Sequence, residues 1–270
     1  MSAQGDVHDS RLESLWYQVD LIVRFMWVVG LAVPSTVLLP LPVSQLFTKR
    51  FRREEALKRL HFMVLWARKT LKWVLGARLM VRGREHLPKN TKGYMYVSNH
   101  QSYVDILVLM SALDTVAFLS KRLVKKIPLI GRSAYCGGTV FFARRDAKDR
   151  MRALEETLKM CEESTAVVVF PEGRRSSDGN LRDKIHPRAI LECFRRGLKV
   201  IPVGHDGSFQ IVSPSMDRVV TGLPVSVHID APLDPRDYPD EEAFVEAVWG
   251  TVGRLHEAAK RDVASDRGRS

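Results

Sequence analysis

Cysteine is scarce in this sequence of 270 residues. Cys136, Cys161 and Cys193 are its only thiols, and their positions show no metal-ligand spacing. Small secreted domains that depend on disulfides carry dense, even-numbered sets of cysteines, whereas a sparse, odd set is typical of a reducing compartment. The composition therefore excludes a disulfide scaffold.

Several other signatures are also missing. The first twenty residues are mostly polar, with four carboxylates, and no small-residue cleavage site follows a basic start, so we expect residues 1–20 to be a polar segment and not a secretory leader. The sequence has no Gly-x-Ser-x-Gly elbow, no His-Glu-x-x-His and no Walker-type phosphate loop. We therefore expect chemistry that uses neither a metal nor a cofactor.

Basic charge, in contrast, is abundant and concentrated. The formal net charge is +11, and the segment from Lys49 to Arg82 alone holds eleven Lys and Arg against two Glu, a local net of +9. The rest of the chain is close to neutral. Such a block indicates an anionic partner surface, either nucleic acid or phospholipid headgroups.

The segment Leu21–Phe47 is almost continuously apolar. It is long enough to cross a bilayer, because about 20 helical residues span a ~30 Å hydrocarbon core. Pro34, Pro40 and Pro42 break a regular helix, however, so a spanning helix, a re-entrant hairpin and a buried core helix all remain open.

An amphipathic helix is predicted over residues 54–80, where Trp66, Trp73 and basic residues flank an apolar stripe. This pattern is typical of an interfacial helix, although packing on the protein's own domain is the alternative. Residues 21–82 are thus predicted to be a membrane-associated helical hairpin or a set of interfacial helices. Their apolar, Trp-containing character favours a membrane over nucleic acid as partner.

From residue 83 the pattern changes to alternating short strands and helices, which predicts an α/β domain over residues 83–262. A mixed, mainly parallel sheet with flanking helices fits this rhythm. Helices are expected near residues 104–113, 147–163, 187–196 and 240–261, and residues 263–270 are expected to form a flexible tail. The expected strands are Tyr94–Val97, Val116–Leu119, Thr139–Phe142, Ala166–Phe170, Val200–Val203 and Val225–Ile229.

The first candidate for chemistry is His100, which follows an expected strand and precedes an expected helix. Ligand sites in open α/β sheets collect at the carboxyl ends of strands, and histidine accepts protons near neutral pH. Asp105 lies five residues further on and can reach the imidazole only if it occupies the first helical turn. The Ser102-x-x-Asp105 spacing also fits a helix cap, so both roles for Asp105 are open.

Two further clusters follow predicted strands and carry paired arginines. Glu172, Gly173 and Arg175 belong to the sequence Phe-Pro-Glu-Gly-Arg-Arg-Ser, and Arg144 follows the strand near residue 140. Guanidinium groups bind phosphate in a bidentate manner, and glycine permits close backbone approach. A base beside a set of guanidiniums suits a hydroxyl acceptor that carries a phosphate, whereas a solvated turn is the alternative for the Glu172 cluster taken alone. The remaining histidines, such as His205 and His228, have no obvious partners.

Taken together, these clusters resemble the motifs of the glycerolipid acyltransferase family typified by 1-acylglycerol-3-phosphate acyltransferase. The resemblance covers about residues 80–230 and comprises four ordered motifs, and the paired apolar segments before them resemble the family's membrane-binding N-terminal helices. The matching residues are Asn99, His100 and Asp105; Lys121, Pro128, Gly131, Gly138 and Arg144; Phe170–Gly173, Arg175 and Ser176; and Val200–Pro202.

Two positions depart from the family pattern. Arg174 stands where the third motif usually has threonine. The segment Ile185-His186-Pro187-Arg188 stands where the family usually has Phe-Lys-x-Gly, so that glycine is lost and the charge differs. This second departure bears on the acceptor headgroup, because the segment lies between two substrate-side motifs.

The resemblance implies an O-acyltransferase that moves a fatty acyl group from acyl-coenzyme A or acyl carrier protein to 1-acylglycerol-3-phosphate, giving phosphatidic acid. It implies that His100 and Asp105 are catalytic and that Lys121, Arg144, Glu172, Gly173 and Arg175 bind the acceptor. The enzyme is expected at a membrane, with its active site on the cytoplasmic side. Another lysophospholipid, glycerol-3-phosphate or an amino-acid-based lysolipid is the alternative acceptor, and a membrane-binding protein with little activity is the non-enzyme alternative.

Overall fold

The computed structural model describes residues 64–113, 116–125, 134, 138–143, 145–182, 184–212 and 219–268. Its centre is a seven-stranded sheet with the strand order β1-β7-β6-β2-β5-β3-β4. The strands are β1 (Arg78–Arg82), β2 (Tyr94–Ser98), β3 (Ala117–Lys121), β4 (Val140–Phe142), β5 (Val167–Val169), β6 (Lys199–Asp206) and β7 (Pro224–Ile229).

The sheet is mixed and mainly parallel, as predicted. Strands β6, β2, β5, β3 and β4 run parallel to one another, β7 pairs antiparallel with β6, and β1 pairs parallel with β7. The central strands read as continuous apolar runs because both of their faces are covered. All strands that run parallel to β2 end at one edge of the sheet.

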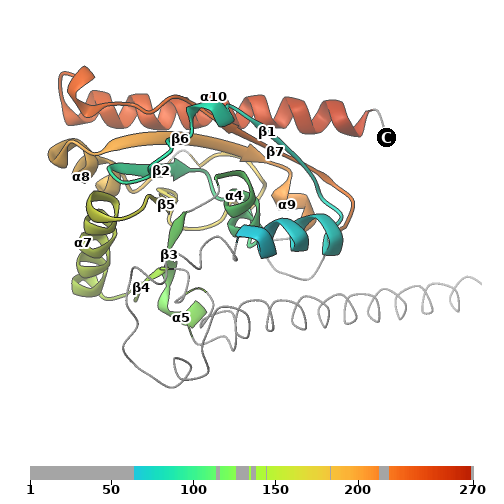
Figure 1. The fold of residues 1–270 in the computed structure, drawn as a ribbon, viewed down its shortest axis with the longest axis horizontal. Helices are drawn as coiled ribbons and strands as arrows, with labels where there is room; N and C mark the ends of the chain where they lie inside the picture. Colours follow the sequence, from blue (N-terminus) through green and yellow to red (C-terminus); the bar gives the residue numbers. More distant parts are fainter. Residues whose placement is uncertain are drawn as a thin grey trace, which may run out of the picture.

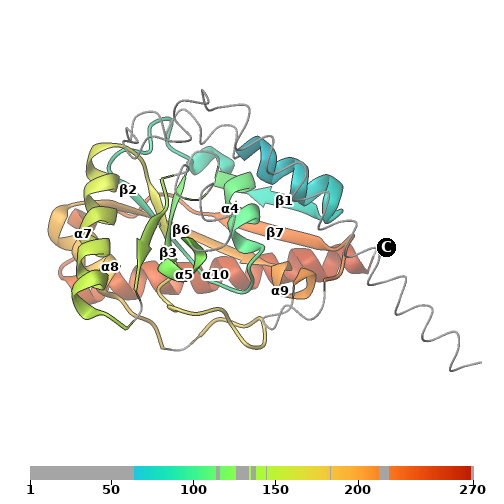
Figure 2. The same ribbon diagram turned by 90° about the horizontal axis from the view of Figure 1, so that it is seen from below.

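Helices cover both faces of the sheet and make a three-layer α/β/α arrangement (Figures 1 and 2). Alternate residues of the strands point to opposite layers. Tyr96 and Ile201 belong to the core cluster under α4 and the helical segment 64–74, whereas Met95 and Val200 pack on the side of α7, α8 and α10.

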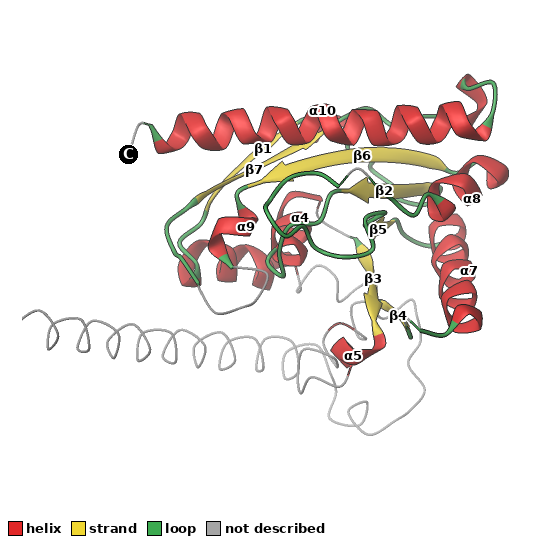
Figure 3. Ribbon diagram, turned by 180° about the vertical axis from the view of Figure 1, so that it is seen from behind, coloured by secondary structure: helices red, strands yellow, loops and turns green. Residues whose placement is uncertain are grey.

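The longer helices begin at side-chain caps or end at glycine, as local sequence chemistry predicts. Asp146 and Asp240 accept backbone hydrogen bonds at the starts of α7 and α10, and Gly197 ends α8 with a φ of 67°. Figure 3 shows these helices in red. The helices are η2 (Thr70–Val74), η3 (Arg84–His86), α4 (Asp105–Leu113), α5 (Arg122–Lys125), α7 (Ala147–Glu163), α8 (Arg188–Arg196), α9 (Ser208–Ile211), η4 (Pro235–Asp237) and α10 (Glu241–Arg267).

The structure corrects two boundaries at the edge of the domain. The predicted helix over 54–80 has given way to β1 by residue 78, so the sheet begins before the expected boundary at residue 83. The expected flexible tail is also wrong in its first half, because α10 continues to Arg267. One contact joins the two elements, since Arg78 on β1 donates to the carboxylate of Asp266 on α10 at 2.6 Å.

The expectations for residues 1–20 and Leu21–Phe47, and for the first part of the 54–80 helix, fall outside the described residues. Residues 64–74 are helical, and Ala67 and Leu71 are buried against the sheet, whereas Trp73 is 76% exposed. Among the helices that the structure describes, none has both the length and the apolar composition needed to cross a membrane.

Candidate active site

The candidate site lies where β2, β5 and β6 end side by side. Their parallel pairing brings the loop after Ser98, the loop after Val169 and the last residues of β6 to the same edge of the sheet. Open α/β sheets bind ligands at this edge. The topology therefore gathers three of the sequence clusters that lie far apart along the chain.

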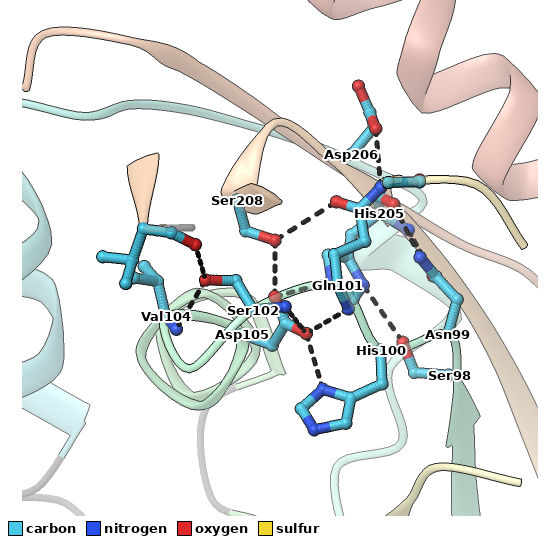
Figure 4. Close-up of polar contacts among 12 residues, drawn as sticks. Ser98, Asn99, His100, Gln101, Ser102, Val104, Asp105, His205, Asp206 and Ser208 are labelled. Atoms are coloured by element: carbon cyan, nitrogen blue, oxygen red, sulfur yellow. Dashed lines mark hydrogen bonds and ion pairs between the residues drawn. The ribbon is translucent and has the colours of Figure 1, made fainter. Parts of the chain in front are cut away.

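His100 and Asp105 are in direct contact, as their spacing allowed. The Nδ1 of His100 lies 2.7 Å from Asp105 Oδ2 (Figure 4). The contact forms because His100 lies in the loop and Asp105 is the first residue of α4. Asp105 Oδ2 also accepts the backbone N–H groups of Gln101 and Ser102 at 2.7 and 2.9 Å. Asp105 is thus both a cap for the start of α4 and the partner of the imidazole.

The surroundings of Asp105 keep this carboxylate ionised. Burial alone raises its pKa, but the contacts with His205 and His100 outweigh that effect and hold the pKa well below its ordinary value. An ionised carboxylate fixes the proton of His100 on Nδ1. The Nε2 of the same ring points away from the network in Figure 4 and is available to accept a proton, and the side chain is 20% exposed.

A second histidine that the sequence did not single out contacts the same carboxylate. His205, the penultimate residue of β6, is fully buried, and its Nε2 lies 3.1 Å from Asp105 Oδ1. Its Nδ1 lies 3.2 Å from Ser98 Oγ. The interpretation that His205 and His228 lack partners is wrong for both, since His228 contacts Asp262 at 3.0 Å. A polar pair that ends a buried apolar strand was the available signal.

The neighbours of His100 in the first motif hold β2 and β6 together. The side-chain amide of Asn99 donates to the backbone carbonyl of His205 and accepts its N–H, both at 3.0 Å. Gln101 is buried, and its side-chain amide donates to Asp206 Oδ1 at 2.8 Å, while its Oε1 lies 3.2 Å from the Ser208 hydroxyl, whose one proton is donated to the nearer Asp105. These amides lock the loop that carries His100.

Glu172 supports the same loop from β5. Its Oε1 accepts the backbone N–H of His100 at 2.9 Å, while Oε2 is buried without a hydrogen-bond partner among the described residues. Burial raises the pKa of Glu172 to about 7. The following residue, Gly173, has a φ of 65°, and a Cβ there lies 2.8 Å from the ring of His186. The turn therefore requires glycine, because a side chain is both strained and obstructed.

Arg175 lies close to the His100 loop, where its guanidinium packs on Tyr103. The guanidinium carbon is 3.4 Å from the centre of the Tyr103 ring, and Tyr103 is itself one of the four residues between His100 and Asp105. Burial lowers the pKa of Arg175, and its Nη1 has no hydrogen-bond partner within the described part of the chain. The geometry presents a partly desolvated cation near His100, which is a suitable environment for an anionic group.

The other two predicted acceptor-binding residues are Lys121 and Arg144. Lys121 is the last residue of β3, whereas Arg144 falls outside the described residues. The loop before α7 is held by Asp149, whose carboxylate accepts the backbone N–H of Ala143 and a hydrogen bond from Arg122 at 2.8 Å. Asp149 thus connects the residue after Lys121 with the residue before Arg144.

Metal binding is the remaining question for this cluster of histidines and carboxylates. In the described ranges, no group of three or more His, Cys, Asp or Glu side chains could hold a metal ion. The expectation of chemistry without a cofactor stays a prediction.

Known proteins match the region that carries these residues. The model of the family described as "Acyltransferase" matches residues 78–211. A chloroplastic 1-acyl-sn-glycerol-3-phosphate acyltransferase of Arabidopsis thaliana is 30% identical over 156 residues, which are 58% of this chain and 44% of that protein. The 1-acyl-sn-glycerol-3-phosphate acyltransferase alpha of Mus musculus is 32% identical over 157 residues, 57% of this chain and 50% of that protein.

The structural comparison extends further along the chain. The crystal structure of the 1-acyl-sn-glycerophosphate acyltransferase PlsC from Thermotoga maritima superposes with a TM-score of 0.73 and 25% sequence identity, covering 90% of this chain and 97% of that chain. The chain spans about half the length of the two sequence relatives above. Motifs, fold and family match all fall on the same region, and residues 78–211 form an acyltransferase-family domain.

Proposed function

We propose that this protein is an O-acyltransferase that transfers a fatty acyl group from a thioester to the hydroxyl of 1-acylglycerol-3-phosphate, forming phosphatidic acid. The observation that carries the proposal is the 2.7 Å contact between His100 Nδ1 and the buried Asp105, which leaves Nε2 free at the carboxyl edge of the sheet. The printed names of the Arabidopsis, mouse and Thermotoga relatives support the choice of acceptor.

The proposed reaction is a direct transfer with His100 as general base. His100 Nε2 takes the proton of the acceptor hydroxyl while the hydroxyl oxygen attacks the thioester carbonyl carbon. A carbon–oxygen ester bond forms, the carbon–sulfur bond breaks, and the leaving thiolate receives the proton from the imidazolium. Asp105 stabilises the imidazolium during the step and keeps its ring oriented.

The acceptor phosphate is proposed to bind the guanidinium of Arg175, with Lys121 and Arg144 completing its site. The desolvated guanidinium on Tyr103 supports this role, because an ion pair is stronger where water is excluded. Glu172 and Gly173 shape the loop on which the acceptor rests. The donor, acyl-coenzyme A or acyl carrier protein, is a substrate and not a resident cofactor.

The protein is proposed to work at a phospholipid surface, with its active site on the cytoplasmic side. The basic block between Lys49 and Arg82 and the exposed Trp73 support a membrane partner and not nucleic acid. Both the acceptor and the product are lipids, so a membrane-bound enzyme meets its acceptor where the acceptor resides.

A transfer assay with the purified full chain tests this proposal. The donors are acyl-coenzyme A and acyl carrier protein, each loaded with a radiolabelled acyl group. Each donor is tested separately with 1-acylglycerol-3-phosphate, a zwitterionic lysophospholipid, glycerol-3-phosphate and an amino-acid-based lysolipid. We expect labelled phosphatidic acid as the main product. Faster transfer to another acceptor assigns a different substrate, and no transfer to any acceptor supports a membrane-binding protein with little activity.

A further inference from the structure

The buried carboxylate of Asp105 has an imidazole at each of its oxygens. His100 contacts Oδ2 at 2.7 Å, and His205 contacts Oδ1 at 3.1 Å. The two rings differ in access, because His100 is 20% exposed whereas the side chain of His205 is fully buried. A substrate can meet His100 but not His205. Any effect of His205 on the reaction therefore passes through Asp105.

The contacts of His205 define which of its nitrogens carries the proton. Nδ1 lies 3.2 Å from the hydroxyl of Ser98, and Nε2 faces Asp105 Oδ1, so the neutral tautomer that suits an ionised carboxylate has its proton on Nε2. The hydroxyl of Ser208 donates to the same Oδ1. The side-chain amide of Asn99 binds both the backbone N–H and the backbone carbonyl of His205. A rigid frame thus holds the Ser208 hydroxyl, as a donor, and the His205 ring, at contact distance, against the oxygen that His100 does not use.

Four other ionisable groups surround His205 and Asp105. Asp206 follows His205 on β6, and His256 on α10 contacts the backbone carbonyl of His205 through Nδ1 at 2.9 Å. Glu172 on the β5 loop interacts electrostatically with both His205 and Asp105, and His100 is reached through Asp105. Among all of these, Asp105 is the group that connects the two imidazoles.

We infer that His205 is a positioning residue that sets the basicity and orientation of His100 through Asp105. The inference rests on the proposed transfer reaction. The contact of the His205 ring with Oδ1 draws negative charge away from Oδ2, the oxygen that faces His100. The same contact prevents the carboxylate from turning away from His100.

A matched pair of variants separates donation from shape. His205→Met and His205→Gln introduce side chains of similar length, but only glutamine has an N–H donor. In His205→Met, the acid limb of the kcat/KM profile should move up by about one pH unit, the scale of a hydrogen bond to a charged group. Its maximal kcat should fall about tenfold because Asp105 is less well held, with KM for both substrates unchanged. His205→Gln should stay within about threefold of wild type in kcat and keep the wild-type pH profile.

A control variant tests whether the effect is specific to His205, and a second variant replaces His205→Met if that protein does not fold. His228→Gln breaks the remote pair with Asp262 and should leave the pH profile unchanged. If His205→Met does not fold, Ser208→Ala removes the other donor to Oδ1 and should move the acid limb in the same direction. Equal pH profiles for His205→Met, or for Ser208→Ala in its place, and for wild type overturn the inference. Equal shifts in the methionine and glutamine variants also overturn it, because shape and not donation is then the cause.

A readout without turnover distinguishes this inference from the proposed function. Protein labelled with nitrogen-15 in histidine reports the titration of the His100 ring in detergent micelles, whether or not transfer occurs. The titration midpoint of His100 should rise by about one unit in His205→Met and stay unchanged in His205→Gln. An inactive wild-type protein with these shifts contradicts the proposed function alone, whereas an active protein without them contradicts the role of His205 alone.

Discussion

The imidazole of His100 is stacked on the ring of Phe170, with ring centroids 4.2 Å apart and planes 15° from parallel. Phe170 follows β5 and begins the third motif, so the His100 ring is held by an aromatic face as well as by a carboxylate. The stack limits ring rotation and keeps Nε2 directed away from Asp105.

Replacing Phe170 with leucine should therefore lower kcat about tenfold, since the base is no longer held in the reactive orientation. The KM for the thioester should stay the same, and Phe170→Tyr should retain most of the activity. Steady-state kinetics of both variants check this effect. Wild-type kcat in Phe170→Leu contradicts a role for the stack.

Tyr103 should control the affinity for the acceptor phosphate through Arg175. Removing the ring in Tyr103→Leu should raise the KM for the phosphorylated acceptor about fivefold, because a cation–π contact is worth about 1 kcal/mol. Tyr103→Phe keeps the ring and should be close to wild type, whereas Arg175→Ala should raise this KM further. The KM for the thioester serves as the internal control. Unchanged acceptor saturation in Arg175→Ala contradicts the phosphate site.

Glu172 should make the stability of the fold depend on pH near neutrality. Burial raises its pKa from 4.5 to about 7, so its neutral form suits the fold. The contribution of Glu172 to the free energy of unfolding is fully present below pH 4.5. It is lost as the pH rises through 7, by roughly 3 kcal/mol in total. Thermal unfolding of Glu172→Gln should show a smaller decline between pH 5 and 8 than the wild type. Glu246→Gln, on the exposed face of α10, should keep the wild-type decline. Parallel curves for Glu172→Gln and wild type contradict the assignment.

The full chain should be released from anionic liposomes by detergent and not by high salt. The basic block contributes about 1 kcal/mol per residue near an anionic surface, and salt screens this attraction. Insertion of the apolar segment Leu21–Phe47 is not screened. Sedimentation after washes with molar salt and with detergent measures the two contributions. Clean release by salt alone indicates a purely electrostatic attachment.

Much of the sheet could be predicted from the sequence, because its central strands are apolar runs bounded by polar loops. All six predicted strands are present, with ends shifted by up to three residues. The edge strand β1 was missed because Arg78 and Arg82 flank only three apolar residues, and its arginines contact carboxylates on α10, which lies far away in the sequence. Pairing with a distant helix leaves no local signal.

The candidate site likewise has a part that the sequence predicts and a part that it does not. The contact between His100 and Asp105 is local, and the helix start that brings them together is visible in the sequence. His205 lies a hundred residues further along the chain and joins the same carboxylate because β6 pairs in parallel with β2. The register of two strands, and not any motif, determines this third contact.

Turnover of His100→Ala is the most direct test of the account. Single-turnover transfer from radiolabelled acyl-coenzyme A to 1-acylglycerol-3-phosphate is measured for wild type and variant at equal amounts of folded, liposome-bound protein. Loss of the general base should lower the rate about a thousandfold, while thermal unfolding and liposome binding stay close to wild type. A folded His100→Ala protein that transfers acyl groups at a near wild-type rate contradicts the mechanism.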